Sequence, residues 1–251
     1  MAKAPQAFVI DAVRTAVGKR NGSLAHVHPI DLGGHAFRGI FARNDVDPAA
    51  IDDAIVGCVD AVGGQAGNIG RLAWLAAGYP EEVPGVTVDR QCGSSQQAIS
   101  FGAQAIMAGN ADLILAGGMQ NMSQIPISSA MIVGREFGFT TPTAESKGWL
   151  ARYGDQEISQ FRGAEMIAQQ WDISRDDMER WALGSHQRAF AAIRGGYFGN
   201  EIVAVEIDGH DFDVDETPRE TTLEKMAGLP VLTEGGRMTA AVASQIPDGA
   251  S

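Results

Sequence analysis

Short apolar runs alternate with longer amphipathic segments along the first half of the chain. Four runs of apolar residues predict β-strands, at residues 8–13, 54–59, 85–88 and 113–116. Between them, apolar side chains recur every three or four positions, which predicts helices over residues 30–44, 69–77 and 95–108. Strands that alternate with helices favour an α/β fold, in which a mostly parallel sheet is covered by helices.

The third of these helices lies in a stretch without charge, because residues 91–111 include no Asp, Glu, Lys or Arg. Length alone would suit a membrane span. The glutamines and glycines of this stretch would be costly in lipid, however. We therefore expect no membrane span here, but a helix that is buried on all sides inside a soluble core.

The pattern changes after residue 118. Residues 119–150 are rich in Ser, Met, Gly and Pro and have weak periodicity, which predicts irregular structure. A helix is predicted over residues 158–171, and another from the N-cap Ser174, with Asp177 three residues on, to Gly195. Residues 202–207 predict a further strand, which an acidic turn over 208–216 follows.

Charge and cysteine content narrow the classes of function. The chain has 19 Lys and Arg against 31 Asp and Glu, a formal net charge of −12, which argues against a nucleic-acid or anionic membrane partner. A few local Arg or Lys side chains could still hold an anionic small ligand. Two cysteines form neither a disulfide framework nor a zinc pattern, and the first residues lack a secretory signal. We expect a cytoplasmic protein without a metal site.

Cys92 is the first candidate for chemistry. It lies between a predicted strand that ends near Asp89 and a helix that begins near Ser94, hence at a helix N-terminus, where an anion is stabilised. A thiolate is the nucleophilic form of cysteine, and Gly93 leaves room for a substrate. The alternative is a buried, inert thiol. That alternative suits Cys58, within the apolar run AIVGCVDAV, better than Cys92.

The sequence around Cys92 resembles a known family. VDRQCGSSQQAISFGAQAIMAGNADLILAGGMQNMSQIP is similar to the nucleophile segment of the thiolases, including the closing Gly117, Gly118, Met122 and Ser123. Three further segments agree with that family: DAVRTAVGKRNGSL, QFRGAEMIAQQWDISRDDMERWALGSHQRA and RMTAAVASQIPDGAS. The resemblance covers essentially the whole chain.

The resemblance implies a layered α/β fold of two similar halves, of which this chain supplies the first. Residues 1–119 and 237–251 would form the N-terminal core half, with a mixed, mostly parallel sheet and a buried nucleophile helix. Residues 120–236 would form an insertion that binds CoA. The Gly-His-Pro, Cys-x-Gly and Asn-Glu-Ala-Phe motifs of the second half do not occur. We therefore expect a piece of a longer protein and assign no catalytic role to any of the five histidines.

The family likeness also implies an activity and its residues. Thiolases cleave or form 3-ketoacyl-CoA, so Cys92 would carry the acyl group, and its backbone N–H would serve an oxyanion hole. CoA and acyl-CoA would be substrates, with no permanently bound cofactor. Arg219 matches a family arginine near the CoA adenine and phosphate, or is a solvated charge. Ser244 matches a serine along the pantetheine arm, or is a small residue at the core edge.

Two departures from the family pattern leave the specificity for the acyl group undetermined. Ser95 replaces the commoner glycine, and Ser159-Gln160-Phe161 replaces His-Met-Gly. The Gln-Phe-Arg-Gly-Ala-Glu form is reminiscent of lipid- or steroid-degrading bacterial thiolases. Two other functions remain: a ketoacyl-synthase-type condensing enzyme, and a non-catalytic acyl-CoA or lipid-binding protein. Thiolases commonly pair through the first-half sheet, so we expect a homodimer or homotetramer.

Overall fold

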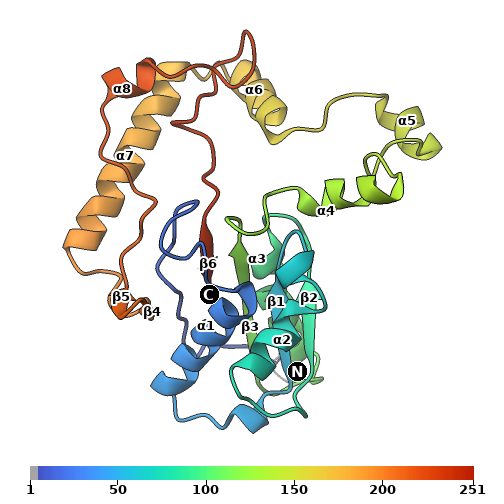
Figure 1. The fold of residues 1–251 in the computed structure, drawn as a ribbon, viewed down its shortest axis with the longest axis vertical. Helices are drawn as coiled ribbons and strands as arrows, with labels where there is room; N and C mark the ends of the chain where they lie inside the picture. The colour runs from blue at the N-terminus through green and yellow to red at the C-terminus, as the bar shows by residue number, and fades with distance from the viewer. Residues whose placement is uncertain (1–4) are drawn as a thin grey trace. The chain divides into compact units, whose positions relative to one another are not determined.

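The computed structural model describes residues 5–251 and divides into two compact units (Figure 1). The sheet unit comprises the chain up to Gly138 together with Phe198–Thr217 and Ile246–Ser251. The helical unit comprises Phe139–Tyr197 and Pro218–Gln245. A separate CoA-binding insertion over residues 120–236 stays a prediction.

A four-stranded sheet in the order β2-β1-β3-β6 is the centre of the sheet unit. Strand β1 (Asp53–Gly57) pairs in parallel with β2 (Gly85–Val88) and with β3 (Ile114–Asn121). Strand β6 (Asp248–Ala250) pairs antiparallel with the end of β3 and was not predicted as a strand. The predicted α/β class with a mixed, mostly parallel sheet is confirmed.

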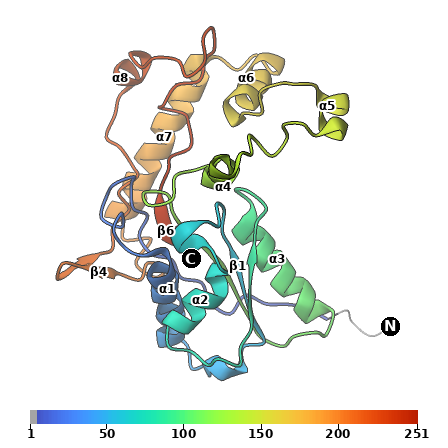
Figure 2. The same ribbon diagram turned by 45° about the vertical axis from the view of Figure 1, so that its right-hand side comes forward.

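Helices cover both faces of this sheet. On one face lie α1 (Pro29–Arg43) and α2 (Ile69–Ala76), where Gly33 of α1 meets the side chain of Met119. On the other face lies α3 (Ser94–Met107), whose Ser95 meets Gly118 (Figure 2). Residues 118 and 119 point to opposite sides because side chains alternate along a strand. Short 3₁₀ turns occur at Pro48–Ala50, Gly63–Gln65 and Val133–Phe137.

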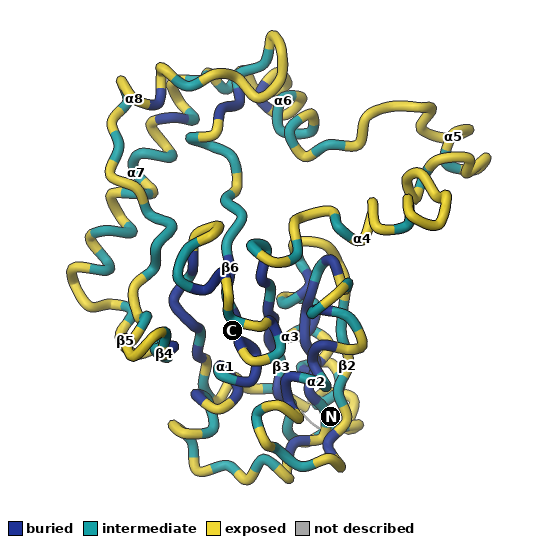
Figure 3. The backbone as a smooth tube through the Cα atoms, in the orientation of Figure 1, coloured by how far each residue is buried: buried dark blue, intermediate teal, exposed yellow. Residues whose placement is uncertain are grey.

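The core lies between the sheet and the α1–α2 pair. Trp74 is fully buried there, and its Nε1–H donates to the carbonyl of Pro80 at 2.8 Å, so its polar atom is satisfied. Leu32, Val56 and Ile69 pack in the same cluster. In Figure 3, dark blue marks the buried residues, which include most of β1 and β3.

The predicted strand over residues 8–13 is wrong. The segment is extended but forms no strand, and Phe8, Val9 and Ile10 are 78%, 79% and 67% exposed. Within residues 5–251 no strand lies beside this segment, so its apolar side chains find no surface to cover. Further along, Arg14 and Gly18 make isolated bridges, to Ile202 and to Asp248.

The expectation that the uncharged helix is buried on all sides is also wrong for this chain. In α3, Ser94, Ala98 and Gly102 are buried against the sheet. The opposite face carries Ile99, 51% exposed, and Phe101, 44% exposed. The described residues place no layer over that face.

The rest of the chain differs from the prediction in several places. Two short helices begin within residues 119–150, where irregular structure was expected, and a short helix over residues 223–227 was not expected. The helix predicted over 158–171 and the strand predicted over 202–207 are each three residues shorter. Helix α4 spans Ser129–Ile132, α5 Lys147–Tyr153, α6 Gln160–Gln170 and α8 Leu223–Ala227. Strands β4 (Val205–Ile207) and β5 (His210–Phe212) form a hairpin, so β5 falls inside the predicted acidic turn. Helix α7 (Arg175–Arg194) begins at the predicted N-cap, where Ser174 and Asp177 form a capping box. Over the described residues, every helix is too short or too polar to cross a membrane.

Candidate functional site

Two glycines bring the start of α3 directly onto the sheet. Gly57 and Gly118 are paired in register on neighbouring strands. A Cβ on Gly57 would lie 2.3 Å from the backbone N of Ser95, and a Cβ on Gly118 would collide with the Ser95 hydroxyl. Because these two positions have no side chains, the first residues of α3 can lie directly against the sheet. This contact positions the turn that precedes α3.

That turn, residues 89–94, is closed by its own side chains. The Oγ of Ser94 accepts the N–H of Arg90 at 2.9 Å and donates to the carbonyl of Gln91 at 2.5 Å. Asp89 accepts the N–H of Gln91 through Oδ1 at 2.8 Å. Gln91 has a φ of 51°, in the left-handed region that non-glycine residues rarely adopt. A buried serine hydroxyl and a strained residue thus hold the turn in one conformation.

Cys92 lies in this turn and is exposed. The next residue, Gly93, is the N-cap of α3 and makes no side-chain cap bond. The strand, turn and helix that the sequence predicts around Cys92 are therefore present, and the thiol is open to a ligand. Its role as a nucleophile stays a prediction.

Cys58 lies in a different environment. It is 2% exposed, and its thiol donates to the Gln120 Oε1 at 3.6 Å. Burial raises the pKa of Cys58 to about 12, and the carboxylates of Asp60 and Asp89 add to this shift. A thiol that stays protonated is a poor nucleophile.

The loop after β3 is anchored by buried carboxylates. Asp248, fully buried in β6, accepts the backbone N–H of Ser123 at 2.9 Å and its hydroxyl at 2.5 Å. Asp60, 2% exposed, accepts the N–H groups of Ser128 and Ala130, both at 2.8 Å. The bonds of Asp248 join the Met-Ser stretch after β3 to the last residues of the chain, and those of Asp60 join residues 128–130 to the segment after β1. Sequence reasoning did not single out either aspartate.

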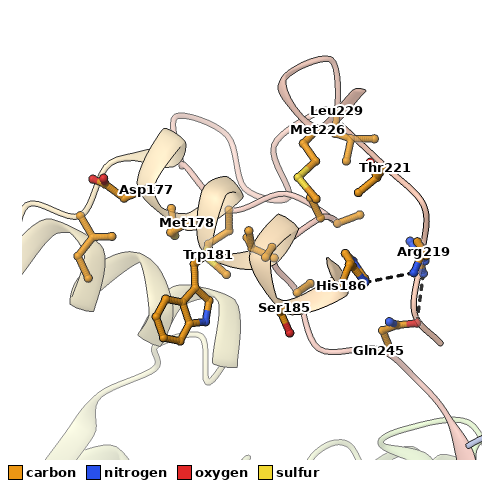
Figure 4. Close-up of a pocket in the computed structure, with 17 residues that line it drawn as sticks. Asp177, Met178, Trp181, Ser185, His186, Arg219, Thr221, Met226, Leu229 and Gln245 are labelled. Atoms are coloured by element: carbon orange, nitrogen blue, oxygen red, sulfur yellow. Dashed lines mark hydrogen bonds between the residues drawn. The ribbon is translucent and has the colours of Figure 1, made fainter. Parts of the chain in front are cut away.

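The helical unit contains a pocket of about 750 Å³ (Figure 4). Its walls come from α7, from α8 and from the segments on either side of α8. The apolar lining includes Met178, Trp181, Met226, Leu229 and Met238.

The polar end of the pocket is made by three side chains from three segments. Nδ1 of His186 accepts the backbone N–H of Arg219 at 3.2 Å. Nη2 of Arg219 donates to Oε1 of Gln245 at 3.4 Å. Burial lowers the pKa of His186, and the nearby positive charge of Arg219 lowers it further. At neutral pH the imidazole is therefore neutral and the guanidinium is the local positive charge.

The α8 wall of the pocket is held by Arg175 at the start of α7. Its Nη2 donates to three backbone carbonyls, of Met226, Ala227 and Leu229, at 2.9–3.0 Å. Its Nε donates to Glu179, a buried carboxylate, at 2.7 Å. Carbonyls at a helix C-terminus have no partner within the helix, so this guanidinium caps α8.

The structure places the two predicted CoA residues differently. Arg219 lines the pocket, and Ser244 does not, although its neighbours Ala243 and Gln245 do. The Ser244 hydroxyl is exposed and donates to the carbonyl of Gln245 at 3.4 Å. Roles for both residues stay predictions. The sequence assigns no role to His186, whereas the structure places it in the pocket lining and in contact with a residue 33 positions away.

Residues 5–251 contain no group of three or more His, Cys, Asp or Glu side chains arranged to hold a metal ion.

Comparison with known proteins gives one consistent result. Residues 7–251 match the family described as "Thiolase, N-terminal domain". A steroid 3-ketoacyl-CoA thiolase, FadA6, of Mycobacterium tuberculosis is 74% identical over 98% of this chain and 60% of its own length. A beta-ketoadipyl-CoA thiolase of Acinetobacter baylyi is 41% identical over 98% of this chain and 64% of its own length. A 3-ketoacyl-CoA thiolase of Yersinia pestis is 40% identical over 97% of this chain and 62% of its own length. The chain thus spans less than two thirds of each of these relatives.

Proposed function

The chain belongs to the thiolase family, whose N-terminal domain it matches over residues 7–251, and on this basis we propose that it carries the acyl group in a thiolase reaction. The family membership confirms the resemblance drawn from the sequence around Cys92. The observation that carries the functional proposal is the exposed thiol of Cys92 on a closed turn at the start of α3.

In the degradative direction, the Cys92 thiolate forms a bond to the 3-keto carbon of a 3-ketoacyl-CoA. The backbone N–H of Cys92, one residue before the N-cap Gly93, would be one donor to the oxyanion that develops. The bond between C2 and C3 then breaks, the C2 enolate takes a proton, and acetyl-CoA leaves. The thiolate of free CoA attacks the acyl–cysteine thioester and regenerates the Cys92 thiolate. The Gly-His-Pro and Cys-x-Gly motifs do not occur in this sequence, so we look for the proton-transfer groups outside it.

We place the nucleotide part of CoA in the pocket of the helical unit. An apolar wall of methionines and Trp181 suits a purine ring, and Arg219 at the polar end suits a phosphate. Ser244 would contact the pantetheine arm, which is thinner and only partly polar. In this proposal CoA enters and leaves as a substrate, and no cofactor is retained.

The acyl group and the assembly belong to the same proposal. The 74% identity with a protein named a steroid 3-ketoacyl-CoA thiolase makes a steroid-derived acyl chain the first class to test. We propose a cytoplasmic homodimer or homotetramer. A non-catalytic acyl-CoA-binding protein is the second candidate, because the sequence holds no motif for the proton-transfer groups. A ketoacyl-synthase-type enzyme would instead accept acyl groups from acyl carrier protein.

Mass spectrometry of the chain after incubation with acetyl-CoA tests the proposal, because transfer of the acetyl group from the CoA sulfur to the Cys92 thiolate releases the CoA thiolate and needs no proton transfer to carbon. We expect one acetyl group on the peptide that contains Cys92, in the unmodified chain and in Cys58→Ala. Cys92→Ala should carry none. Binding of CoA without an acyl group on Cys92 would overturn the catalytic proposal and support the binding protein.

A further inference from the structure

His186 lines the pocket, and the bond made by one of its ring nitrogens identifies the other as a hydrogen-bond donor. Nδ1 of His186 accepts the backbone N–H of Arg219 at 3.2 Å, so Nδ1 carries no proton. A neutral imidazole bears one proton, which in this tautomer lies on Nε2. Burial and the charge of Arg219 lower the pKa of His186, so the neutral form prevails at pH 7. The ring therefore presents Nε2–H as a donor.

Both His186 and Arg219 line the pocket, and Figure 4 shows them side by side at one end. Asp177, also in the lining, is drawn at the opposite end, and His186 follows it by nine positions along α7. At a rise of about 1.5 Å per residue, that spacing is about 13 Å along the helix. The carboxylate of Asp177 thus lies far from the end that holds the guanidinium, and an anion is favoured at the His186 end.

Arg219 is fixed at two points there. Its backbone N–H is held by His186, and its guanidinium reaches Gln245 at 3.4 Å. An arginine whose position is set in advance, next to a neutral N–H donor, matches a phosphate group, which accepts several hydrogen bonds and carries charge.

We propose that His186 is a specificity-determining residue of the pocket, which donates from Nε2 to a phosphate oxygen of the nucleotide that Arg219 attracts. This inference rests on the proposed use of the pocket for CoA. In this proposal, His186 distinguishes phosphorylated from unphosphorylated ligands. The apolar wall binds the purine ring, which both classes of ligand share.

Isothermal titration calorimetry of the 251-residue chain with CoA, 3′-dephospho-CoA and adenosine tests the inference. His186→Leu removes donor and acceptor, and we expect its affinity for CoA to fall about tenfold or more, as for the loss of a hydrogen bond to a charged group. His186→Gln can accept through Oε1 and donate through Nε2, so it should stay within about threefold of the unmodified chain. Affinity for adenosine should be equal in all three proteins. His210→Leu, in the exposed hairpin strand β5, is the matched control.

The outcomes separate the two proposals. If the unmodified chain does not bind CoA, the assignment of the pocket fails, and this inference fails with it. If CoA binds and His186→Leu binds it equally well, only the inference fails. A purely structural role for His186 would weaken adenosine and CoA alike and leave His186→Gln as weak as His186→Leu, which would also overturn it. A loss of CoA affinity in His186→Leu without any loss of 3′-dephospho-CoA affinity would identify the 3′-phosphate as the contacted group.

Discussion

Replacing Gly57 by alanine tests how the turn that bears Cys92 is positioned. The new Cβ would lie 2.3 Å from the N of Ser95, 2.5 Å from the C of Ser94 and 2.7 Å from the Cα of Ser95. All three are backbone atoms of the first turn of α3, so no side-chain rotation relieves the contact. Carbon atoms prefer separations of about 3.5–4.0 Å, so α3 must move away from the sheet by about 1 Å.

The cost follows from two opposing effects. Overpacking a core costs about 1–3 kcal/mol, and a collision with backbone belongs at the upper end of that range. Alanine also restricts the unfolded chain, which offsets about 0.4–1 kcal/mol. We expect Gly57→Ala to lower the free energy of unfolding of the sheet unit by about 2 kcal/mol, or its urea midpoint by about 1 M.

Hydrogen exchange in increasing urea, read on peptides from β1 and α3, measures this unit separately from the helical unit. Gly249→Ala is the control, because its Cβ would have only the Oγ1 of Thr15 nearby, at an ordinary 3.5 Å. The control should stay within about 0.5 kcal/mol of the unmodified chain. Equal urea midpoints for Gly57→Ala and Gly249→Ala would refute the idea that α3 packs this closely on the sheet because Gly57 has no side chain.

Three further predictions concern the thiols, a helix cap and pH. Ellman's reagent at pH 8 should label exposed Cys92 quickly and leave Cys58, with its pKa of about 12, unlabelled until the chain unfolds; two fast thiols would contradict the burial of Cys58. Ser174→Ala removes the N-cap of α7 and should cost about 1 kcal/mol in urea unfolding followed by circular dichroism; an unchanged midpoint would show that the capping box is dispensable. Burial lowers the pKa of His35 and of His186 from 6.5, so the unfolded chain takes up protons first and the free energy of unfolding should fall from pH 7.5 to 5.5; equal urea midpoints at these two pH values would contradict this.

Periodicity was enough to predict most of the sheet unit, because burial there is decided by near neighbours in sequence. The helix predicted over residues 30–44 is Pro29–Arg43, and the strand predicted over 85–88 has those bounds. Each of these elements packs one face against other residues of this chain. The spacing of apolar residues therefore predicts the element and its buried face.

Two of the errors of fold arise where an apolar surface has no partner among the described residues. Phe8, Val9 and Ile10 read as a strand, yet a strand needs a neighbour to pair with, and none is present. The uncharged helix reads as fully buried, yet Ile99 and Phe101 are exposed. A sequence pattern shows that a surface is suited to burial, and it does not show which chain buries it. Both surfaces are consistent with a chain that spans about 60% of the length of FadA6.

The two candidate sites differ in how far sequence could predict them, and the reason is the distance along the chain between their parts. The turn around Cys92 is built from residues 89–94, so its glycine and serine follow the cysteine directly and can be read together. The polar end of the pocket joins positions 186, 219 and 245. No local pattern links these, and Arg219 was found only through the family resemblance. His186 gains meaning from one bond to the backbone of Arg219, which fixes its tautomer and so decides whether it donates or accepts. A histidine in a sequence has no such direction until its partner is known.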